Sequence, residues 1–411
     1  MSRVHDSLSR LFEHHKVIIW YDETEDFRDD WESLELTGIN KVTVNNNEFA
    51  VKHLIYIEKP DERFLLYIPF ARPEIEDNWL LDLELSNYLF HTDREAMILQ
   101  ELDLPISLRA WLKPHLEFFK SKERIKHFNQ VKQENDGEHE LSLRLVQVVL
   151  DAESIILNDL VTEYAELFAF DKSDDKEKEL NRFGLQNIFW DEVKRQYEYE
   201  NKGVSIYNLL LEMFQKDFSP LSDKANVNHN AEVLVSKWKD KKSFEDAFRE
   251  LSKRVEKDLR IKELLDKLTL TEIVDDDTFE SIDKQIIIEL AERIVSGSIS
   301  LYELEKIIKK RQSKFWVSEY SAFYNALETG LRLIEGVKTQ ENIEVKDYND
   351  GFKQYTTKWY IIDQYYREFI QYYREVKQNR VLSSLYEWVH KIYSNSWLFN
   401  LSNKWQKFID R

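Results

Sequence analysis

Four acidic residues lie close together in the sequence, directly after a short apolar run. Asp22, Glu23, Glu25 and Asp26 follow residues 17–21, whose continuous apolar character indicates a buried strand. Because open α/β sheets bind ligands at the carboxyl ends of their strands, these carboxylates could hold Mg²⁺. Alternatively, Asp22 caps a helix, with Glu25 at capping-box spacing, and the other acids favour the positive N-terminus of that helix. We favour the capping interpretation and assign no metal ligand.

Other common catalytic and cofactor motifs do not occur in the sequence. There are no cysteines, which excludes disulfides, zinc fingers and thiol nucleophiles. No glycine lies between Gly38 and Gly137, so a Walker or GxGxxG phosphate loop has no place there. His5, His14 and His15 form no HExxH or HxH pattern and are typical of solvated residues at a helix end. Without a GxSxG serine motif either, we predict no catalytic residue and no cofactor in this chain.

The C-terminal part of the sequence is unusually aromatic. Residues 348–408 hold 17 aromatic residues, and residues 338–411 carry 12 Lys and Arg against 9 Asp and Glu. Aromatic and basic side chains together could stack on the bases of single-stranded nucleic acid. Alternatively, they fill a helical core or an interdomain contact, which is the interpretation we favour. The residues that we predict for a docking surface toward a neighbouring domain are Trp359, Phe369, Tyr373, Trp388 and Trp397.

Composition and charge limit the functional class. The chain has 411 residues, of which 42% are hydrophobic and 33% charged, and this balance is typical of a globular protein with a sizeable core. The net charge of −19 argues against a dedicated nucleic-acid binder, because phosphate contacts need clustered Lys and Arg. The start of the chain lacks the apolar run of a signal peptide, and we expect a cytoplasmic protein.

The first 105 residues alternate between strand and helix patterns. Apolar runs at 17–21, 41–44 and 64–68 predict three strands. A helix with Phe27, Trp31 and Leu34, ended by Gly38, and a second helix opened by 45–47 are expected between them. Further helices are predicted near 4–13, 79–90 and 93–102. This βαβαβ order predicts a small three-layer α/β domain with a short parallel sheet over residues 1–105.

The remainder of the chain is predicted to be helical. All six prolines lie at or before Pro220, and proline and glycine are the residues that interrupt helices. We expect a helical domain over 106–337 and an aromatic-rich helical segment over 338–411. The apolar spacing predicts helices at 106–130, 140–169, 186–199, 204–216, 231–239, 243–268, 278–296 and 300–334.

Several short phrases occur in order along the chain: Ile19-Trp20-Tyr21-Asp22 with Phe27, Asn47-Glu48-Phe49, Phe64-Leu65-Leu66-Tyr67 with Pro69, Asn78-Trp79-Leu80-Leu81-Asp82, and Lys404-Trp405-Gln406 with Ile409-Asp410. Together they resemble the amino-terminal region of PglZ (type A) from BREX bacteriophage-exclusion systems. The resemblance covers the whole chain, although each phrase is short and none is catalytic.

The resemblance implies a parent protein with a central domain of the alkaline-phosphatase superfamily. That domain opens with a strand and an SDALR-like segment whose Asp contributes to a divalent-metal site. Residues 222–225 are similar to it only superficially and follow no apolar strand, so no metal ligand of the family is transferred to this chain. We therefore expect the chain to be the N-terminal part of a longer protein and not an enzyme in itself.

Three functional hypotheses follow from the sequence. In the first, the chain is an interaction and scaffold region that docks other BREX components and positions the phosphatase-like domain. The partners that the resemblance implies are BrxB, the PglX methyltransferase and PglZ itself. In the second, the chain is a nucleic-acid-binding region of the defence complex. The third, a metal-dependent hydrolase that uses Asp22 and Glu25, has the weakest support.

Overall fold

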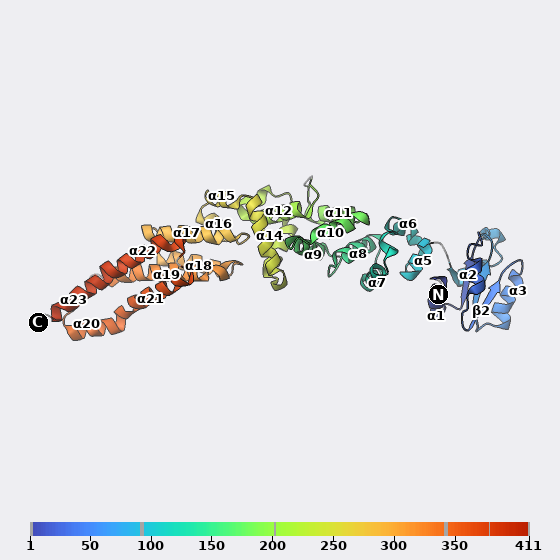
Figure 1. Ribbon diagram of the computed structural model, residues 1–411, viewed down its shortest axis with the longest axis horizontal. Coiled ribbons are helices and arrows are strands. Elements are labelled where there is room, and N and C mark those ends of the chain that lie inside the picture. Colours follow the sequence, from blue (N-terminus) through green and yellow to red (C-terminus); the bar gives the residue numbers. More distant parts are fainter. Residues whose placement is uncertain (1–2, 91–93, 201–202, 341–343, 378, 410–411) are drawn as a thin grey trace. The chain divides into compact units, whose positions relative to one another are not determined.

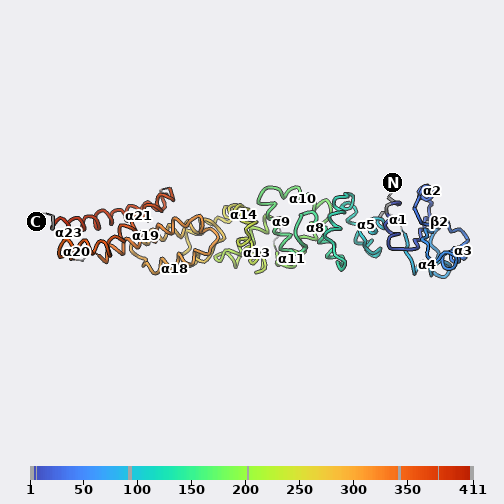
Figure 2. Tube along the Cα trace, turned by 90° about the horizontal axis from the view of Figure 1, so that it is seen from below, coloured from blue at the N-terminus to red at the C-terminus, as the bar shows by residue number. Residues whose placement is uncertain are grey.

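The structure is a computed structural model that describes residues 3–90, 94–200, 203–340, 344–377 and 379–409. The chain divides into two compact units. Figures 1 and 2 show the helices and strands, coloured along the sequence. Unit 1 comprises residues 1–155 and 178–188, and unit 2 comprises residues 156–177 and 189–411. The three domains expected from the sequence stay a prediction.

Unit 1 begins with a parallel sheet of four strands in the order β2-β3-β1-β4. The strands are β1 (Val17–Tyr21), β2 (Ile39–Thr43), β3 (Arg63–Ile68) and β4 (Tyr88–Phe90). In the central pair, Val17 lies opposite Phe64 and Tyr21 opposite Ile68. The predicted fold class, a small α/β domain with a short parallel sheet followed by a large helical region, is confirmed.

Helices cover both faces of this sheet. Successive side chains of a strand point to opposite faces, so Ile18 and Trp20 pack on one side, and Val17 and Ile19 on the other. The first side is covered by α1 (Arg3–His14) and α2 (Arg28–Ser33). The second side is covered by α3 (Glu48–His53), its π-helical continuation η1 (Leu54–Glu58) and α4 (Leu81–Ser86). The result is the three-layer arrangement that buried parallel strands require.

Three local predictions for this sheet domain were wrong. The segment 79–90 is not one helix, because Asn87 has an extended backbone and the next three residues form β4, whose Phe90 lies opposite Trp20. The helix expected around Trp31 is short and ends at Ser33. Gly38 therefore does not end it, and lies instead in the turn before β2, with a φ of 75° that suits glycine.

The rest of unit 1 consists of short helices. They are α5 (Arg94–Glu101), α6 (Arg109–Leu112), α7 (Lys122–Val131) and α8 (Glu138–Leu150), and 3-10 turns at 106–108, 113–115 and 118–120 interrupt the helix predicted over 106–130. The helix predicted over 140–169 also breaks, at Asp151, whose left-handed φ of 63° ends α8. Helices α10 (Ser173–Arg182) and α11 (Gln186–Tyr197) contain residues of both units.

The regular secondary structure of unit 2 is entirely helical in the residues that the structure describes. In chain order the helices are α9 (Leu157–Ala169), α12 (Ile206–Asp217), α13 (His229–Asp240), α14 (Glu245–Asp258), α15 (Ile261–Leu265), α16 (Leu270–Ile273), α17 (Glu280–Ser296), α18 (Leu301–Arg311), α19 (Val317–Gln340), α20 (Tyr348–Gln354), α21 (Tyr360–Glu375), α22 (Ser383–Lys391) and α23 (Phe399–Ile409). Two π-helical stretches, η8 (Tyr355–Trp359) and η10 (Ile392–Leu398), join α20 to α21 and α22 to α23. No helix in the described ranges is both long enough and apolar enough to cross a bilayer.

A fully buried ion pair lies in the core of unit 2. Arg311 of α18 and Asp283 of α17 are both inaccessible to solvent, and their closest N–O distance is 2.6 Å. The hydroxyl of Tyr324 from α19 donates to the same carboxylate at 2.5 Å, and Arg311 also donates to the carbonyl of Val274 at 3.1 Å. Because each charged group has several partners, the cost of its burial is offset, and three helices are joined at one point.

A glycine sets the close approach of two long helices in unit 2. A Cβ atom at Gly330 of α19 would lie 3.3 Å from the ring of Phe369 on α21 and 3.3 Å from Val389 on α22. At Gly336, further along α19, the nearest atom would be Cγ1 of Ile362 at 3.5 Å, an ordinary contact. Tight packing therefore depends on the absence of a side chain at Gly330 but not at Gly336.

Candidate functional site

The carboxyl end of β1 is the first place where the sequence suggested chemistry. Asp22 is only 3% exposed there. Its Oδ2 accepts hydrogen bonds from the hydroxyl of Tyr67 at 2.7 Å and from the backbone N–H of Phe27 at 3.0 Å. Burial, followed by the bond to Asp22, raises the pKa of Tyr67. Asp22 thus holds the chain after β1 against β3.

The capping role predicted for Asp22 was wrong. The residue that precedes α2 is Phe27, and no side chain caps this helix. Glu25 adopts a left-handed φ of 53°, which places a turn between Asp22 and the helix. Asp22 still accepts a hydrogen bond from the backbone N–H of Phe27. It therefore stabilises the turn that precedes α2 and does not cap the helix itself.

The other acidic residues of this group do not converge on Asp22. Glu23, Glu25 and Asp26 are exposed, Glu25 pairs with Arg28 at 2.9 Å, and Thr24 donates to Asp26 at 2.6 Å. Within the described ranges, no group of three or more His, Cys, Asp or Glu residues is placed to hold a metal ion. This arrangement does not fit a Mg²⁺ site, because such a site needs several free oxygen ligands around one point.

A second buried carboxylate lies near the same edge of the sheet and was missed in the sequence. Glu84 of α4 is 5% exposed. It accepts from the hydroxyl of Tyr21 at 2.5 Å and from Nδ2 of Asn78 at 2.8 Å, and Arg72 donates to it through Nε at 2.9 Å. Burial, followed by the bond to Glu84, raises the pKa of Tyr21. No local spacing signals this cluster, since Tyr21 is 63 residues away in sequence.

The histidines near the start of the chain have structural neighbours. The ring of His15 lies 4.6 Å from that of Tyr88, and Nε2 of His5 lies 3.2 Å from the carbonyl of Glu35. Burial, with the charge of His14 as a smaller cause, lowers the pKa of His15. These contacts connect α1 with the sheet and with the chain after α2.

Four of the five aromatic residues predicted for a docking surface are buried in unit 2. Trp359, Phe369, Tyr373 and Trp397 are at most 9% exposed, and only Trp388 is partly accessible. The indole N–H of Trp359 donates to Gln340 at 3.0 Å, and that of Trp397 donates to Asp363 at 3.0 Å. The four buried residues fill the core between the C-terminal helices, so they do not themselves form an exposed surface.

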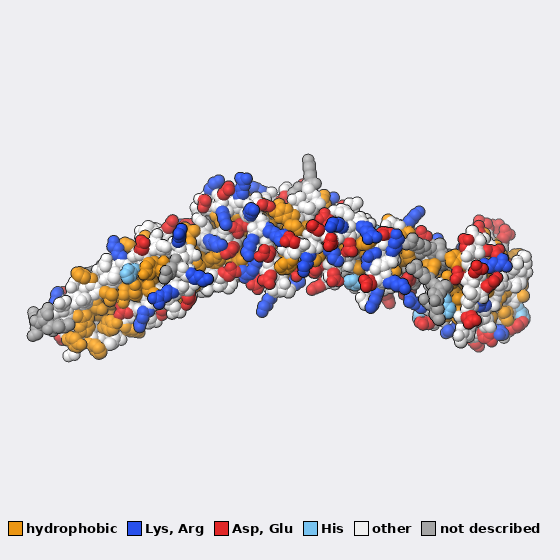
Figure 3. Space-filling model, viewed as in Figure 1, with side chains coloured by type: hydrophobic (Ala, Val, Ile, Leu, Met, Phe, Trp, Pro, Cys, Tyr) orange, Lys and Arg blue, Asp and Glu red, His pale blue; other side chains and the backbone are white. Residues whose placement is uncertain are grey.

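Other aromatic and aliphatic residues of the same helices face solvent. We call them the C-terminal apolar surface: Tyr348, Phe352, Tyr360, Leu398 and Phe399, which are between 41% and 61% exposed. Figure 3 shows hydrophobic side chains gathered over these helices. The ring of Tyr348 rests on Trp405 at 5.0 Å, edge to face, which connects α20 to α23. The aromatic content of this segment was evident in the sequence, but which residues point outward depends on the π-helical stretches, and no simple period predicts those.

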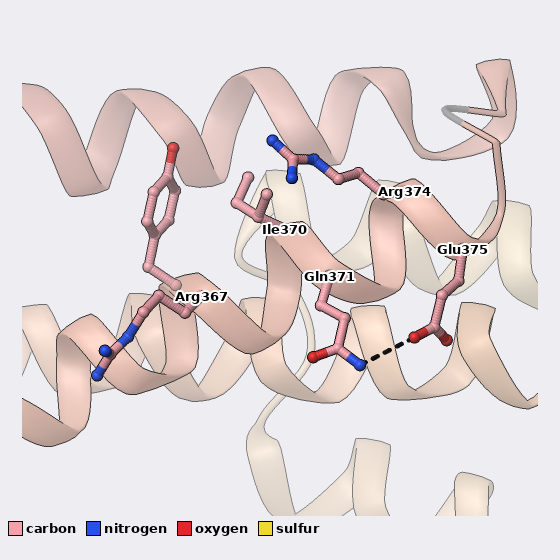
Figure 4. A pocket seen from close by; sticks show the side chains of 6 residues that line it. Arg367, Ile370, Gln371, Arg374 and Glu375 are labelled. Atoms are coloured by element: carbon pink, nitrogen blue, oxygen red, sulfur yellow. Dashed lines mark hydrogen bonds between the residues drawn. The ribbon is translucent and has the colours of Figure 1, made fainter.

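A groove runs along α21 of the same unit (Figure 4). It has a volume of about 560 Å³, and its lining residues are Tyr366, Arg367, Ile370, Gln371, Arg374 and Glu375. Tyr366 stacks on Tyr393 at 3.7 Å, and its hydroxyl lies 2.6 Å from Nδ1 of His390. Arg367 and Arg374 are both exposed, so the groove combines two cations with an aromatic ring.

Comparison with known proteins gives two similarities that extend over nearly the whole chain. The alkaline phosphatase-like protein BrxZ of Escherichia coli is 27% identical over 98% of this chain and 50% of its own length. The alkaline phosphatase-like protein PglZ of Bacillus cereus is 26% identical over 96% of this chain and 48% of its own length. This chain is similar to BrxZ and PglZ. It spans about half the length of these curated relatives.

The similarity to BrxZ and PglZ supports the family resemblance found in the sequence. No protein-family model matches the chain. No solved structure matches it either.

Proposed function

We propose that this chain is an interaction and scaffold region of a BREX-type anti-phage defence protein of the cytoplasm. In this role it docks other defence components and positions a phosphatase-like domain. The C-terminal apolar surface carries the proposal, because exposed aromatic side chains supply much of the binding energy at protein interfaces. The similarity to BrxZ and PglZ, which are named as alkaline phosphatase-like and are about twice as long, supports the family context.

The buried carboxylates of unit 1 agree with a non-catalytic role for the sheet domain. Asp22 and Glu84 each accept hydrogen bonds from two or more donors within the protein. A carboxylate occupied in this way is held in place and has little capacity left for a metal ion or a substrate. We therefore assign metal-dependent chemistry to the phosphatase-like domain and not to the residues of this sheet.

A pull-down with defined partners tests the scaffold proposal. The tagged chain is presented with BrxB, with the PglX methyltransferase and with a longer PglZ protein, each purified. We expect at least one to be retained, and the double variant Phe352→Ser/Phe399→Ser to weaken its binding about tenfold or more. Tyr302, which is 76% exposed on α18, provides the matched control, since Tyr302→Ser should leave binding unchanged. If a longer PglZ chain retains these partners and this chain retains none, the proposal fails.

Nucleic-acid binding is a second candidate function, and the groove on α21 favours it. Arg367 and Arg374 could contact phosphates while Tyr366 offers a ring for stacking. A mobility shift with single- and double-stranded DNA at low salt tests this, because electrostatic affinity is greatest there. We expect Arg367→Ala/Arg374→Ala to abolish the shift, and the exposed pair Lys306→Ala/Lys309→Ala to keep it. No shift at low salt would remove this function.

A further inference from the structure

Unit 1 carries an exposed apolar face that its own core does not use. Phe49, Tyr56, Trp79 and Leu85 are between 47% and 79% exposed, and we call them the α3–α4 face. The opposite sides of the same helices supply Val51, Ile55 and Leu83 to the core below the sheet. The exposed side chains are therefore additional to those that hold the helices in place.

The two elements of this face are fixed to one another. The rings of Phe49 and Trp79 lie 5.3 Å apart. Next to them, Lys52 pairs with Asp82 at 2.6 Å and donates to the carbonyl of Trp79 at 3.0 Å. Figure 2 shows α3 and α4 beside each other. Residues 49, 52 and 56 lie on one side of α3 and its continuation η1, and Asp82 and Leu85 lie three residues apart on α4, so the ion pair of Lys52 and Asp82 has exposed apolar residues as neighbours.

The charges at the border of this face are acidic. Residues 74–86 contain five acidic residues and no basic residue. Asp82 and Glu84 are paired with Lys52 and Arg72. The remaining Glu74, Glu76 and Asp77 are exposed, and in the described part of the chain they form no ion pair. Glu74 and Glu76 directly flank Ile75, which is 72% exposed, and all three acids precede Trp79 by a few residues.

We propose that the α3–α4 face docks a basic, amphipathic segment of a partner protein. An apolar side chain of the partner would pack against Phe49 and Trp79, and its Lys or Arg residues would face Glu74, Glu76 and Asp77. A cation can also lie over the exposed indole of Trp79. This surface belongs to unit 1 and is independent of the C-terminal apolar surface.

The acidic charge of the α3–α4 face favours a basic segment over DNA, anionic lipid or a second copy of this chain. DNA and anionic lipid both present negative charge, and the acidic border repels them. A second copy of this chain carries a net charge of −19, and it would bring the same acids to the contact if it docked through the same face. A basic segment is the occupant for which the apolar and the charged parts of the face both contribute.

Binding of defined peptides tests the proposal. The probe is a fluorescein-labelled helical peptide with lysines on one side and leucines on the other, followed by fluorescence anisotropy. The comparison peptides replace the lysines with glutamates or the leucines with serines. We expect only the lysine–leucine peptide to bind the full chain tightly, and Phe49→Ser/Trp79→Ser to weaken it about thirtyfold. Glu74→Gln/Glu76→Gln/Asp77→Asn should weaken it less and should reduce its salt dependence.

Matched variants away from the face separate specific docking from attraction to an acidic protein. Tyr302→Ser removes an exposed aromatic residue, and Glu263→Gln/Asp266→Asn removes exposed acids, both in unit 2. Neither should change the affinity. The proposal is overturned if the Phe49→Ser/Trp79→Ser variant binds the lysine–leucine peptide as tightly as the unaltered chain does. It is also overturned if the glutamate peptide binds. Two other results also overturn it. One is a dimer, seen in sedimentation, that Trp79→Ser dissociates, and the other is a preference for anionic vesicles or DNA that Trp79→Ser abolishes.

Discussion

In unit 1 the buried carboxylates lie near the carboxyl edge of the sheet, whereas in unit 2 a complete ion pair lies among packed helices. Asp22 and Glu84 accept mainly from neutral donors, and Arg72, a cation bound to Glu84, is half exposed. Arg311 and Asp283 are both without solvent exposure. A parallel sheet satisfies its backbone internally and leaves polar side chains to its ends, while helices can present charged groups to one another along their length. The two units should therefore respond differently when one polar partner is removed.

The largest effect is expected at the buried ion pair of unit 2. Asp283→Asn leaves the Arg311 guanidinium buried without a counter-charge, and we expect it to lower the free energy of unfolding by about 3–5 kcal/mol. Urea denaturation followed by circular dichroism measures this. The double variant Asp283→Leu/Arg311→Met is the control. Its free energy of unfolding should fall less than that of the single variant, because no charge remains buried. A loss below about 1 kcal/mol in Asp283→Asn would contradict the account.

A smaller effect is expected at the edge of the sheet. Glu84→Gln places an amide opposite Arg72 and removes a charge-assisted bond, so we expect a loss of about 2 kcal/mol. Hydrogen exchange should locate the increase in opening to amides of α4 and β1. Glu32, an exposed acid of α2 that pairs with Arg28, offers the matched control, and Glu32→Gln should change little. If Glu32→Gln lowers the free energy of unfolding as much as Glu84→Gln does, the burial of Glu84 is not the reason for its contribution to stability.

Packing without charge can be tested separately within α19 of unit 2. Gly330→Ala adds a methyl group 3.3 Å from Phe369, and we expect it to destabilise the protein by about 1 kcal/mol. Gly336→Ala meets only an ordinary contact, so its higher helix propensity should stabilise the protein by up to about 1 kcal/mol. If thermal or urea unfolding shows a lower stability for Gly330→Ala and a higher stability for Gly336→Ala, the close approach of α19 to its neighbours is supported. The same sign for both variants would contradict it.

The smallest expected effect is a loss of stability of unit 1 at mildly acidic pH. Burial lowers the pKa of His115 and of His15, so the unfolded chain binds protons more readily than the folded one. The stability from their neutral forms is present above their ordinary pKa near 6.5 and is lost as pH falls through the folded values. Hydrogen exchange at pH 7.5 and 5.5 (after correction for intrinsic rates) should show weakened protection around these residues. His115→Gln should reduce this pH dependence, and an unchanged dependence would contradict the prediction.

Periodicity predicted the elements more successfully than their ends. The runs at 17–21 and 64–68 identified β1 and β3, because strands buried on both faces are apolar throughout. The three residues of β4 were assigned to a helix, since so short a strand is defined by pairing with β1 and not by any pattern of its own. The helix predicted over 243–268 missed the left-handed Arg260, which lies between the end of α14 and the start of α15, for a similar reason: a single φ angle does not change the apolar period.

The candidate surfaces were less predictable than the fold. The aromatic content around Trp359 and Trp397 was clear from the sequence, yet these residues are buried while Phe352 and Phe399 are exposed. Composition shows how many aromatic residues a segment has, and tertiary packing decides which of them face solvent. The bond between Tyr21 and Glu84 could not be found from sequence spacing, because it depends on the fold bringing β1 and α4 together.

The outer strands of the sheet affect how the protein behaves at high concentration. On one side the sheet ends in β4, of which the described part of the chain contains three residues. On the other side it ends in β2, where Asn40 and Lys41 interrupt the apolar pattern. Short or charged border strands are poor templates for strand addition between molecules. Many copies of this domain can therefore be concentrated in one place without their sheets joining into fibres.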